Sequence, residues 1–233
     1  MFRRIIIALC VLAACACALD RIWDTRYTFG PEFPTEDRFS VGTGFYTTYN
    51  EDGTIPTNIQ IGINDQWEMG GKIFFSTHDK LESVQAFADV GAKYKFQELS
   101  TIGADFLVGV NNGEGGGVVF SYMRKQPLSD NFSNIVEGRA GFFHAVAGKG
   151  GYMKLALGAT PQLYLGTLIH AMMGIETSGS IGNIKEDFMM DIVPRIEVNV
   201  KPYLHFTGEL AIGILQGKNN DNTRAGIYGR MDF

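Results

Sequence analysis

The residues of this sequence that could carry chemistry are few, and their spacing forms no catalytic or metal-binding pattern. The four histidines, His78, His144, His170 and His205, are scattered along the chain, and none lies at the short spacing of a metal-ligand pair. The glycine-rich run at 113–117 lacks the lysine and the Ser or Thr of a phosphate-binding loop. We therefore expect no cofactor, no metal site and no enzymatic activity.

Charged side chains, in contrast, recur at every second position over long stretches. Between 190 and 200, Asp191, Arg195 and Glu197 share one face, while the intervening residues, such as Ile196, are apolar. The same alternation gives these candidates for a polar face that lines the inside of a barrel: Lys72, Asp89, Lys93, Asp105, Glu137, Arg139, Asp191, Arg195, Glu197, His205, Glu209 and Arg230. Such groups either pair across strands and fill a narrow interior, or line a polar path with a weak ion preference.

A period of two is typical of β-strands, and twelve segments show it. They lie at 38–49, 57–64, 67–77, 84–96, 101–111, 117–126, 132–145, 151–165, 168–177, 187–199, 203–215 and 223–233. Many have the roughly 9–11 residues that a tilted strand needs to cross a bilayer. Their connections are alternately short and mostly longer, as on the two rims of an outer-membrane barrel. The sequence therefore predicts an all-β fold: a closed antiparallel up-and-down transmembrane β-barrel of about 12 strands.

Alternation alone also fits a soluble sandwich or a lipocalin-like barrel, whose polar face points outward. Two features favour a polar interior. Glycines gather on the polar face, where the inside of a curved sheet is crowded; they are Gly42, Gly44, Gly62, Gly70, Gly91, Gly103, Gly109, Gly141, Gly158, Gly174, Gly213 and Gly226. Tyrosines and a tryptophan lie near strand ends, as an interfacial girdle requires; they are Tyr49, Trp67, Tyr94, Tyr122, Tyr152 and Tyr203.

The start of the chain has the pattern of a secretory signal. Arg3 and Arg4 precede an apolar run, and Ala18 completes a small-x-small cleavage site. Alternatively, Cys15 lies in a lipobox-like context and becomes the lipidated first residue. The expected organisation is a signal peptide at 1–18, an N-terminal periplasmic arm at 19–37 and the barrel at 38–233. The net charge of −5 gives no basic field, so nucleic acid is not expected as a partner.

The last strand ends on an aromatic residue. Ile227, Met231 and Phe233 fall on one face, interrupted by Gly229. This pattern resembles the terminal signal of bacterial outer-membrane β-barrel proteins, which the barrel-assembly machinery recognises; Gly229 departs from it. The sequence pattern at 58–75 and 121–143 also resembles that of the small transporter- and porin-like barrels. Barrel phospholipases place a serine two residues after a histidine, but Val146 follows His144 here.

These observations and the resemblance together predict a protein of the bacterial outer membrane. Its expected partners are membrane lipid, the assembly machinery and small polar solutes. We expect a channel or passive transporter for such solutes. The alternatives are a non-conducting structural or surface-interaction barrel and a soluble secreted β-protein.

Overall fold

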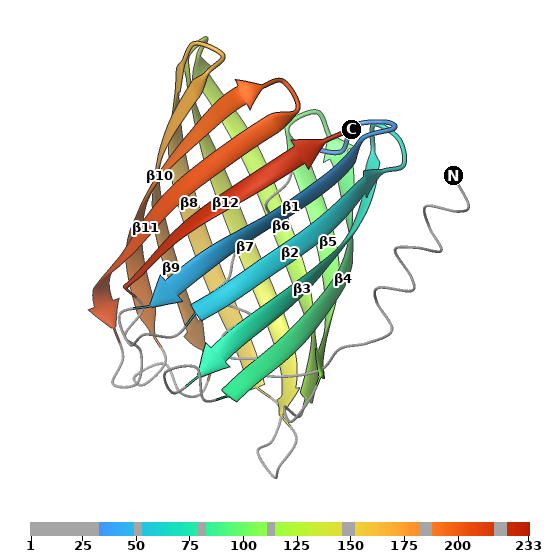
Figure 1. Ribbon diagram of the computed structural model, residues 1–233, viewed down its shortest axis with the longest axis vertical. Coiled ribbons are helices and arrows are strands. Elements are labelled where there is room, and N and C mark those ends of the chain that lie inside the picture. The colour runs from blue at the N-terminus through green and yellow to red at the C-terminus, as the bar shows by residue number, and fades with distance from the viewer. Residues whose placement is uncertain are drawn as a thin grey trace.

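The computed structural model describes residues 33–48, 53–78, 83–110, 115–145, 152–181, 188–216 and 223–233. Its strands are β1 (Phe39–Thr48), β2 (Gly53–Gly62), β3 (Trp67–His78), β4 (Ser83–Gln97), β5 (Ser100–Val110), β6 (Gly115–Ser129), β7 (Phe132–Ala145), β8 (Tyr152–Leu165), β9 (Ile169–Ser180), β10 (Met189–Lys201), β11 (Leu204–Gln216) and β12 (Arg224–Asp232). Each strand pairs antiparallel with its sequence neighbours, and β12 pairs with β1 (Figure 1). The predicted closed barrel of twelve strands is therefore confirmed. No helix in the described ranges is long and apolar enough to cross a membrane.

The outer face of the barrel is apolar, whereas the inner face carries the charged and polar groups together with some buried apolar side chains, among them Phe74, Leu107 and Val193. In β10, Asp191 is fully buried, whereas Ile196, on the opposite face, is 57 % exposed. Because successive side chains of a strand point to opposite faces, the same division runs along the other strands. Glu176 and Lys154 are buried, while Leu157 and Phe106 are exposed. An apolar outer surface around a polar interior is the arrangement of a barrel that spans a bilayer.

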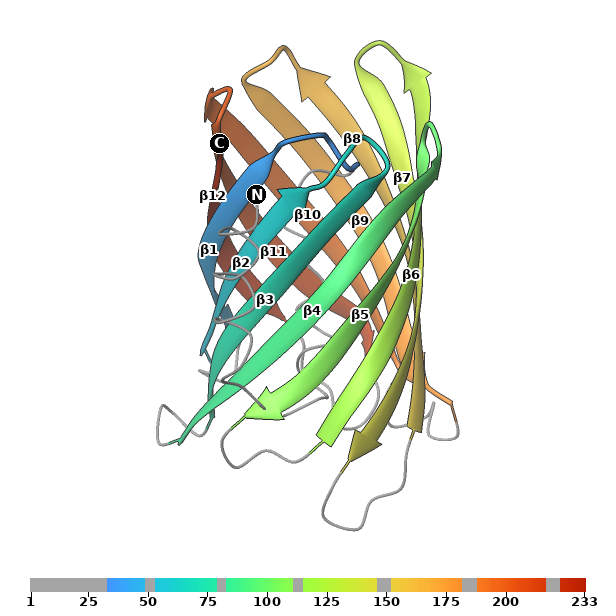
Figure 2. The ribbon, with the colours of Figure 1, turned by 90° about the vertical axis from the view of Figure 1, so that its right-hand side faces the viewer.

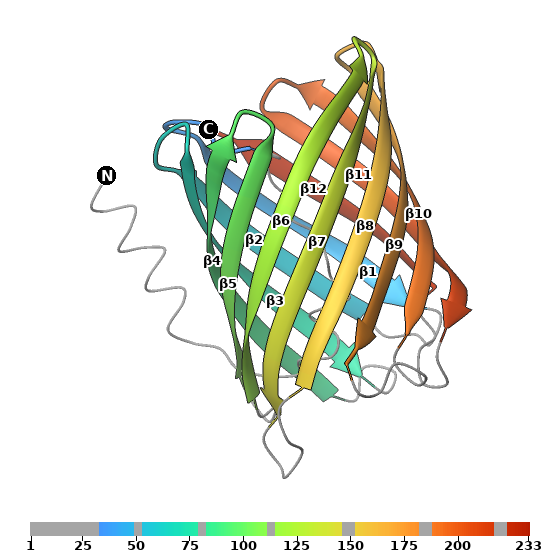
Figure 3. The same cartoon turned by 180° about the vertical axis from the view of Figure 1, so that it is seen from behind.

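One end of the barrel carries tight connections, at 63–66, 98–99, 130–131, 166–168 and 202–203. Figure 2 shows these turns at the top, together with the C-terminus. Gly166 begins the β8–β9 turn with a φ of 70°, a conformation that glycine adopts without steric cost. The connections at the other end lie mostly outside the described residues. Figure 3 shows the far wall, where β6, β7 and β8 pair side by side.

Aromatic side chains gather on the outside near the short-turn end. The rings of Trp67 and Tyr94 have centroids 4.6 Å apart, and those of Phe39 and Phe233 are 5.9 Å apart. Tyr203 is 51 % exposed at the same end. Such a ring of amphipathic side chains is placed at the height of lipid headgroups in membrane barrels. Among the predicted girdle positions, Tyr49 and the side chain of Tyr152 lie outside the described part.

Two prolines account for differences from the predicted strand boundaries. β2 begins at Gly53 rather than at 57, and β6 continues to Ser129 rather than ending at 126. Pro56 lies where the β1–β2 ladder is interrupted, and Pro127 lies beyond the end of the β5–β6 ladder. At Pro56 the interrupted ladder is the one with β1, and at Pro127 the ladder that has ended is the one with β5. No backbone hydrogen bond to that neighbouring strand is lost by the missing proline N–H, so proline is tolerated.

Gly229 departs from the terminal pattern of outer-membrane barrels, and a side chain of the neighbouring strand β11 shields it. Phe206 lies opposite it, and two carbons of the Phe206 ring are 3.3 and 3.4 Å from the position that a Cβ of Gly229 would take. An aromatic ring that shields a strand glycine restores the packing that the missing side chain lacks. Ile227 and Phe233 on the same outer face are both 69 % exposed.

The described end of the predicted arm lies against the short-turn end of the barrel. The guanidinium of Arg38 donates a hydrogen bond to the carbonyl of Phe33 at 3.0 Å. The N–H of Glu36 donates to Asp65 in the β2–β3 turn at 3.4 Å. The rest of the predicted arm and both predicted signal-processing sites lie outside the described residues.

Candidate functional site

Oppositely charged side chains pair across the inner face of β3 and β4. Lys72 Nζ lies 3.3 Å from Asp89 Oδ2, and Lys93 Nζ lies 3.1 Å from Glu68 Oε1. Both pairs join residues that are directly opposite in the ladder. Cross-strand pairs of opposite charge stabilise a sheet modestly, and here they keep charges inside the barrel compensated. The pairs border a cavity of about 50 Å³.

A second, more deeply buried group of charges lies across β9, β10, β11 and β12. Arg195 bridges two carboxylates: its Nη2 is 2.5 Å from Glu176 Oε1, and its Nε is 2.7 Å from Glu209 Oε2. Arg224 Nε lies 3.6 Å from the other oxygen of Glu209. The Glu176 and Glu209 side chains are each 2 % exposed. Buried carboxylates need such compensation, because an isolated charge in this setting is strongly unfavourable.

Between these two groups, β7 contributes an ion pair of its own. Arg139 Nη2 lies 3.1 Å from Glu137 Oε2, two residues earlier in the same strand. Residues two apart in a strand share a face, so both side chains lie inside the barrel. Asp105 on β5 also belongs to the inner face, and Asp191 on β10 is fully buried there.

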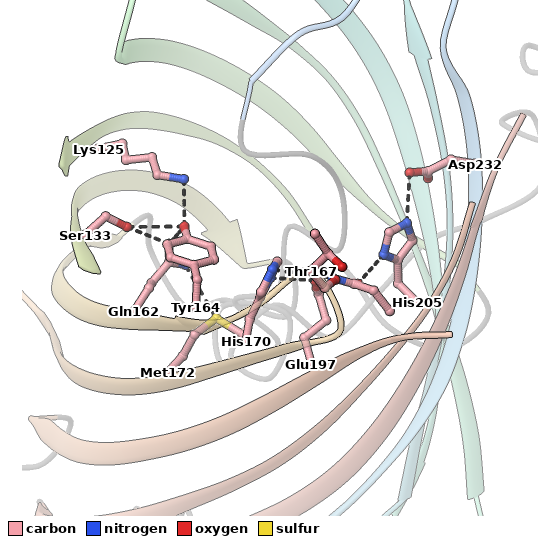
Figure 4. A network of polar contacts seen from close by, with 11 residues as sticks. Lys125, Ser133, Gln162, Tyr164, Thr167, His170, Met172, Glu197, His205 and Asp232 are labelled. Carbon is pink, nitrogen blue, oxygen red and sulfur yellow. Dashed lines mark hydrogen bonds and ion pairs between the residues drawn. The ribbon is translucent and has the colours of Figure 1, made fainter. Parts of the chain in front are cut away.

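A hydrogen-bonded group at the short-turn end is centred on Tyr164 (Figure 4). The hydroxyl of Tyr164 accepts a hydrogen bond from Lys125 Nζ at 2.8 Å and donates one to Gln162 Oε1 at 2.7 Å. Ser133 Oγ lies 3.2 Å from the same hydroxyl. The ammonium of Lys125 also lies 5.2 Å from the centre of the Tyr164 ring. This group therefore ties β6, β7 and β8 together on the inner face.

Two histidines extend the polar contacts across the next strands, as Figure 4 shows. His170 Nδ1 lies 3.2 Å from Glu197 Oε1, and His205 Nε2 lies 3.4 Å from Asp232 Oδ2. Asn199 stands between them, with its amide oxygen 2.5 Å from His205 Nδ1. Each histidine thus contacts one carboxylate, an arrangement that orients both rings toward the interior.

All twelve charged and polar candidates occupy the inner face, but the structure separates them into these neighbouring groups. His205 and Arg230 lie near Asp232, and Glu197 lies with His170. Whether the twelve line a path for solutes stays a prediction.

Sequence reasoning missed Lys125, Gln162 and Tyr164 as candidates. The predicted candidates are charged residues and one histidine of clearly alternating segments, whereas Gln162 and Tyr164 are neutral. Their spacing of two residues, continuing from Gly158 and Thr160, is the signal that places them on the inner face. Among the described residues, no three His, Cys, Asp or Glu side chains are grouped so that they could hold a metal ion.

Comparison with solved structures shows which proteins share this fold. No protein-family model matches the sequence, and no curated protein matches it. A KdgM porin in complex with disordered oligogalacturonate aligns with a TM-score of 0.60 and 13 % identity, over 83 % of this chain and 99 % of that one. A NanC porin aligns with a TM-score of 0.57 and 10 % identity, over 84 % and 98 % of the two chains. At these identities the likeness concerns the fold. The predicted resemblance to porin-like outer-membrane barrels is confirmed at that level.

Proposed function

We propose that this porin-like outer-membrane barrel is a passive channel for small polar solutes. The observation that carries the proposal is the interior itself, which presents charged, amide and hydroxyl groups from nearly every strand while the outer face is apolar. A lining of donors and acceptors can replace part of the hydration of a passing solute, which an apolar interior cannot do.

The pairing of interior charges supports weak selectivity. Lys72, Lys93 and Arg195 each lie within 3.3 Å of a carboxylate, so their fields are largely compensated. We therefore propose that neutral or zwitterionic polar solutes pass as readily as ions. The KdgM porin was solved with oligogalacturonate, a saccharide, which supports molecules of sugar chemistry as the solute class.

We also propose that the protein is exported and then inserted into the outer membrane. The pattern at 1–18 supports export, with cleavage near Ala18 and lipidation at Cys15 as the alternative outcome. The outward-facing Ile227, Met231 and Phe233 of the last strand support recognition by the barrel-assembly machinery.

A non-conducting, filled barrel is the second candidate, and the burial of one wall favours it. Lys154 and Glu176 are 2 % exposed, and Asp191 and Val193 are fully buried. In a wide aqueous lumen these inner side chains would contact water. A twelve-strand barrel lies between filled eight-strand barrels and open sixteen-strand porins, so both candidates fit its size.

Liposome swelling separates the two candidates. Vesicles containing the refolded protein are diluted into isotonic solutions of neutral polyols and sugars of increasing size. We expect swelling that is fast for glycerol, slower for monosaccharides and slowest for larger sugars, and absent from protein-free vesicles. No swelling with any solute, either for the whole protein or after deletion of 19–32, would rule out the channel and support the filled barrel.

A further inference from the structure

Two glycines form the floor of the cavity on the inner face of β3 and β4. Gly70 and Gly91 lie directly opposite one another in the ladder. In the same row, Gln60 of β2 lies opposite Gly70, and Asp105 of β5 lies opposite Gly91. Gln60 Cγ is 3.3 Å from the position of a Gly70 Cβ, and a methyl group on Gly91 would overlap Asp105 Oδ1. The Gln60 and Asp105 side chains therefore approach the floor from its two ends.

The walls of this hollow are the two ion pairs of β3 and β4. Lys72–Asp89 lies along one side and Glu68–Lys93 along the other, and both border the cavity of about 50 Å³. A water needs roughly 10–15 Å³ of such space, so the hollow has room for an ion with a few waters.

The side chains around the hollow have oxygens that lack hydrogen-bond donors. Gln60 is 6 % exposed, and its buried Oε1 accepts no hydrogen bond from the described residues. The Asp105 carboxylate belongs to neither ion pair of the walls. Its charge acts on Lys72 and on Arg139 of β7, but each of these cations is paired with another carboxylate. A carboxylate offers only acceptors, as does an amide oxygen. The lining holds three carboxylates (Glu68, Asp89, Asp105) and two ammonium groups (Lys72, Lys93), which leaves one negative charge.

From this geometry we propose that the hollow binds a small monovalent cation such as Na⁺, held mainly by Asp105 and the Gln60 amide oxygen. The cation neutralises the one uncompensated charge and satisfies the oxygens that lack donors. Both ammonium groups already pair with carboxylates, so the hollow is unsuited to an anion. A divalent cation would leave an excess positive charge beside Lys72 and Lys93. The inference adds to the proposed channel an ion-binding site on its inner wall. Binding of the ion does not require the channel to be open, and only movement of the ion through the barrel rests on the proposed function.

Sodium-23 NMR of the full-length protein in detergent tests the site directly. Wild-type protein is expected to broaden the sodium resonance saturably as protein-bound sodium exchanges, and added potassium chloride should compete more strongly than choline chloride. Asp105→Asn removes the charge, and Gly70→Ala fills the floor without changing charge. Both should lose most of the saturable broadening. The matched controls, Asp65→Asn in a turn and Gly208→Ala on the outer face, should keep it.

A wild-type protein without saturable broadening overturns the proposal, as do Asp105→Asn and Gly70→Ala variants that broaden the resonance like wild type. Folding of each variant is checked independently by the heat-dependent shift of the barrel on a gel. A wild-type protein that passes solutes but binds no sodium would reject only this site. Sodium binding in a protein that passes no solute would instead reject only the channel.

Discussion

Tyr46 of β1 and Gly226 of β12 face each other across the seam that closes the barrel. The Tyr46 ring occupies the space in which a Gly226 side chain would lie. Two residues along the seam the relation is reversed, because Tyr228 of β12 lies opposite Gly44 of β1. The hydroxyl of Tyr228 donates a hydrogen bond to Asn58 on β2. The seam is thus held by two interlocking tyrosines in addition to its ladder of backbone hydrogen bonds.

Gly226→Ala should destabilise the closed barrel. The added methyl overlaps the Tyr46 ring, which is buried and cannot move without displacing its neighbours. Overpacking of this kind costs roughly 1–3 kcal/mol. Urea unfolding of refolded protein in detergent measures it. Gly208→Ala is the matched control, because nothing lies within 4 Å of its added methyl. Equal midpoints for the two variants would contradict the interlocked seam.

Arg195→Met should be among the most damaging interior substitutions. It leaves Glu176 and Glu209 buried without the guanidinium that bridges them. Removing one partner of a buried charge group costs about 3–5 kcal/mol. The same unfolding measurement applies, with exposed Lys201→Met as the control, and Arg195→Met combined with Glu176→Gln and Glu209→Gln should recover part of the loss. An unchanged midpoint for Arg195→Met would show that these charges are hydrated and that the lumen is wide.

Tyr164→Phe should weaken the short-turn end. The substitution keeps the ring but removes the hydroxyl that contacts Lys125, Gln162 and Ser133. Loss of a partly buried hydrogen-bonding group costs about 1–3 kcal/mol. Tyr203→Phe at the same end, on an exposed ring, should change stability little. If both variants unfold alike, the hydroxyl contacts of Tyr164 contribute nothing measurable.

The faces of the strands were predictable from sequence because the side-chain period of a strand is two residues. Asp191 and Ile196 could be assigned to opposite faces without any knowledge of their neighbours, and the structure places them so. Strand ends near Pro56 and Pro127 were not predictable, because a proline is tolerated when one neighbouring ladder has ended or is interrupted there. That condition depends on the adjacent strand.

The grouping of the site residues depends on register, which sequence patterns do not supply. Lys93 lies opposite Glu68 and Gly70 opposite Gly91 only because of the exact alignment of β3 with β4. Turn geometry and bulges set that alignment, and a shift of one residue would turn every side chain to the other face. The individual charges could therefore be proposed, whereas the glycine floor between Gln60 and Asp105 could not.

Phe233→Ser should lower assembly in cells more than stability in vitro. The backbone hydrogen bonds between Phe233 and Phe39 remain, and only an outward-facing ring is lost. We expect the folded, heat-modifiable fraction in outer-membrane preparations to fall several-fold, while the refolded barrel changes by less than about 1 kcal/mol. Leu165→Ser, another exposed position at this end, is the control for lost lipid contact. Equal membrane levels for wild type and Phe233→Ser would exclude a role in recognition.

Conductance across a planar bilayer tests the channel most directly. The refolded protein, shown to be closed by its heat-dependent gel shift, is added to a membrane between two potassium chloride solutions of different concentration. The paired charges around Lys72, Lys93 and Arg195 predict discrete conductance steps with a reversal potential near zero, displaced slightly toward cation preference. A folded protein that gives no steps at any voltage, with or without 19–32, would contradict the account.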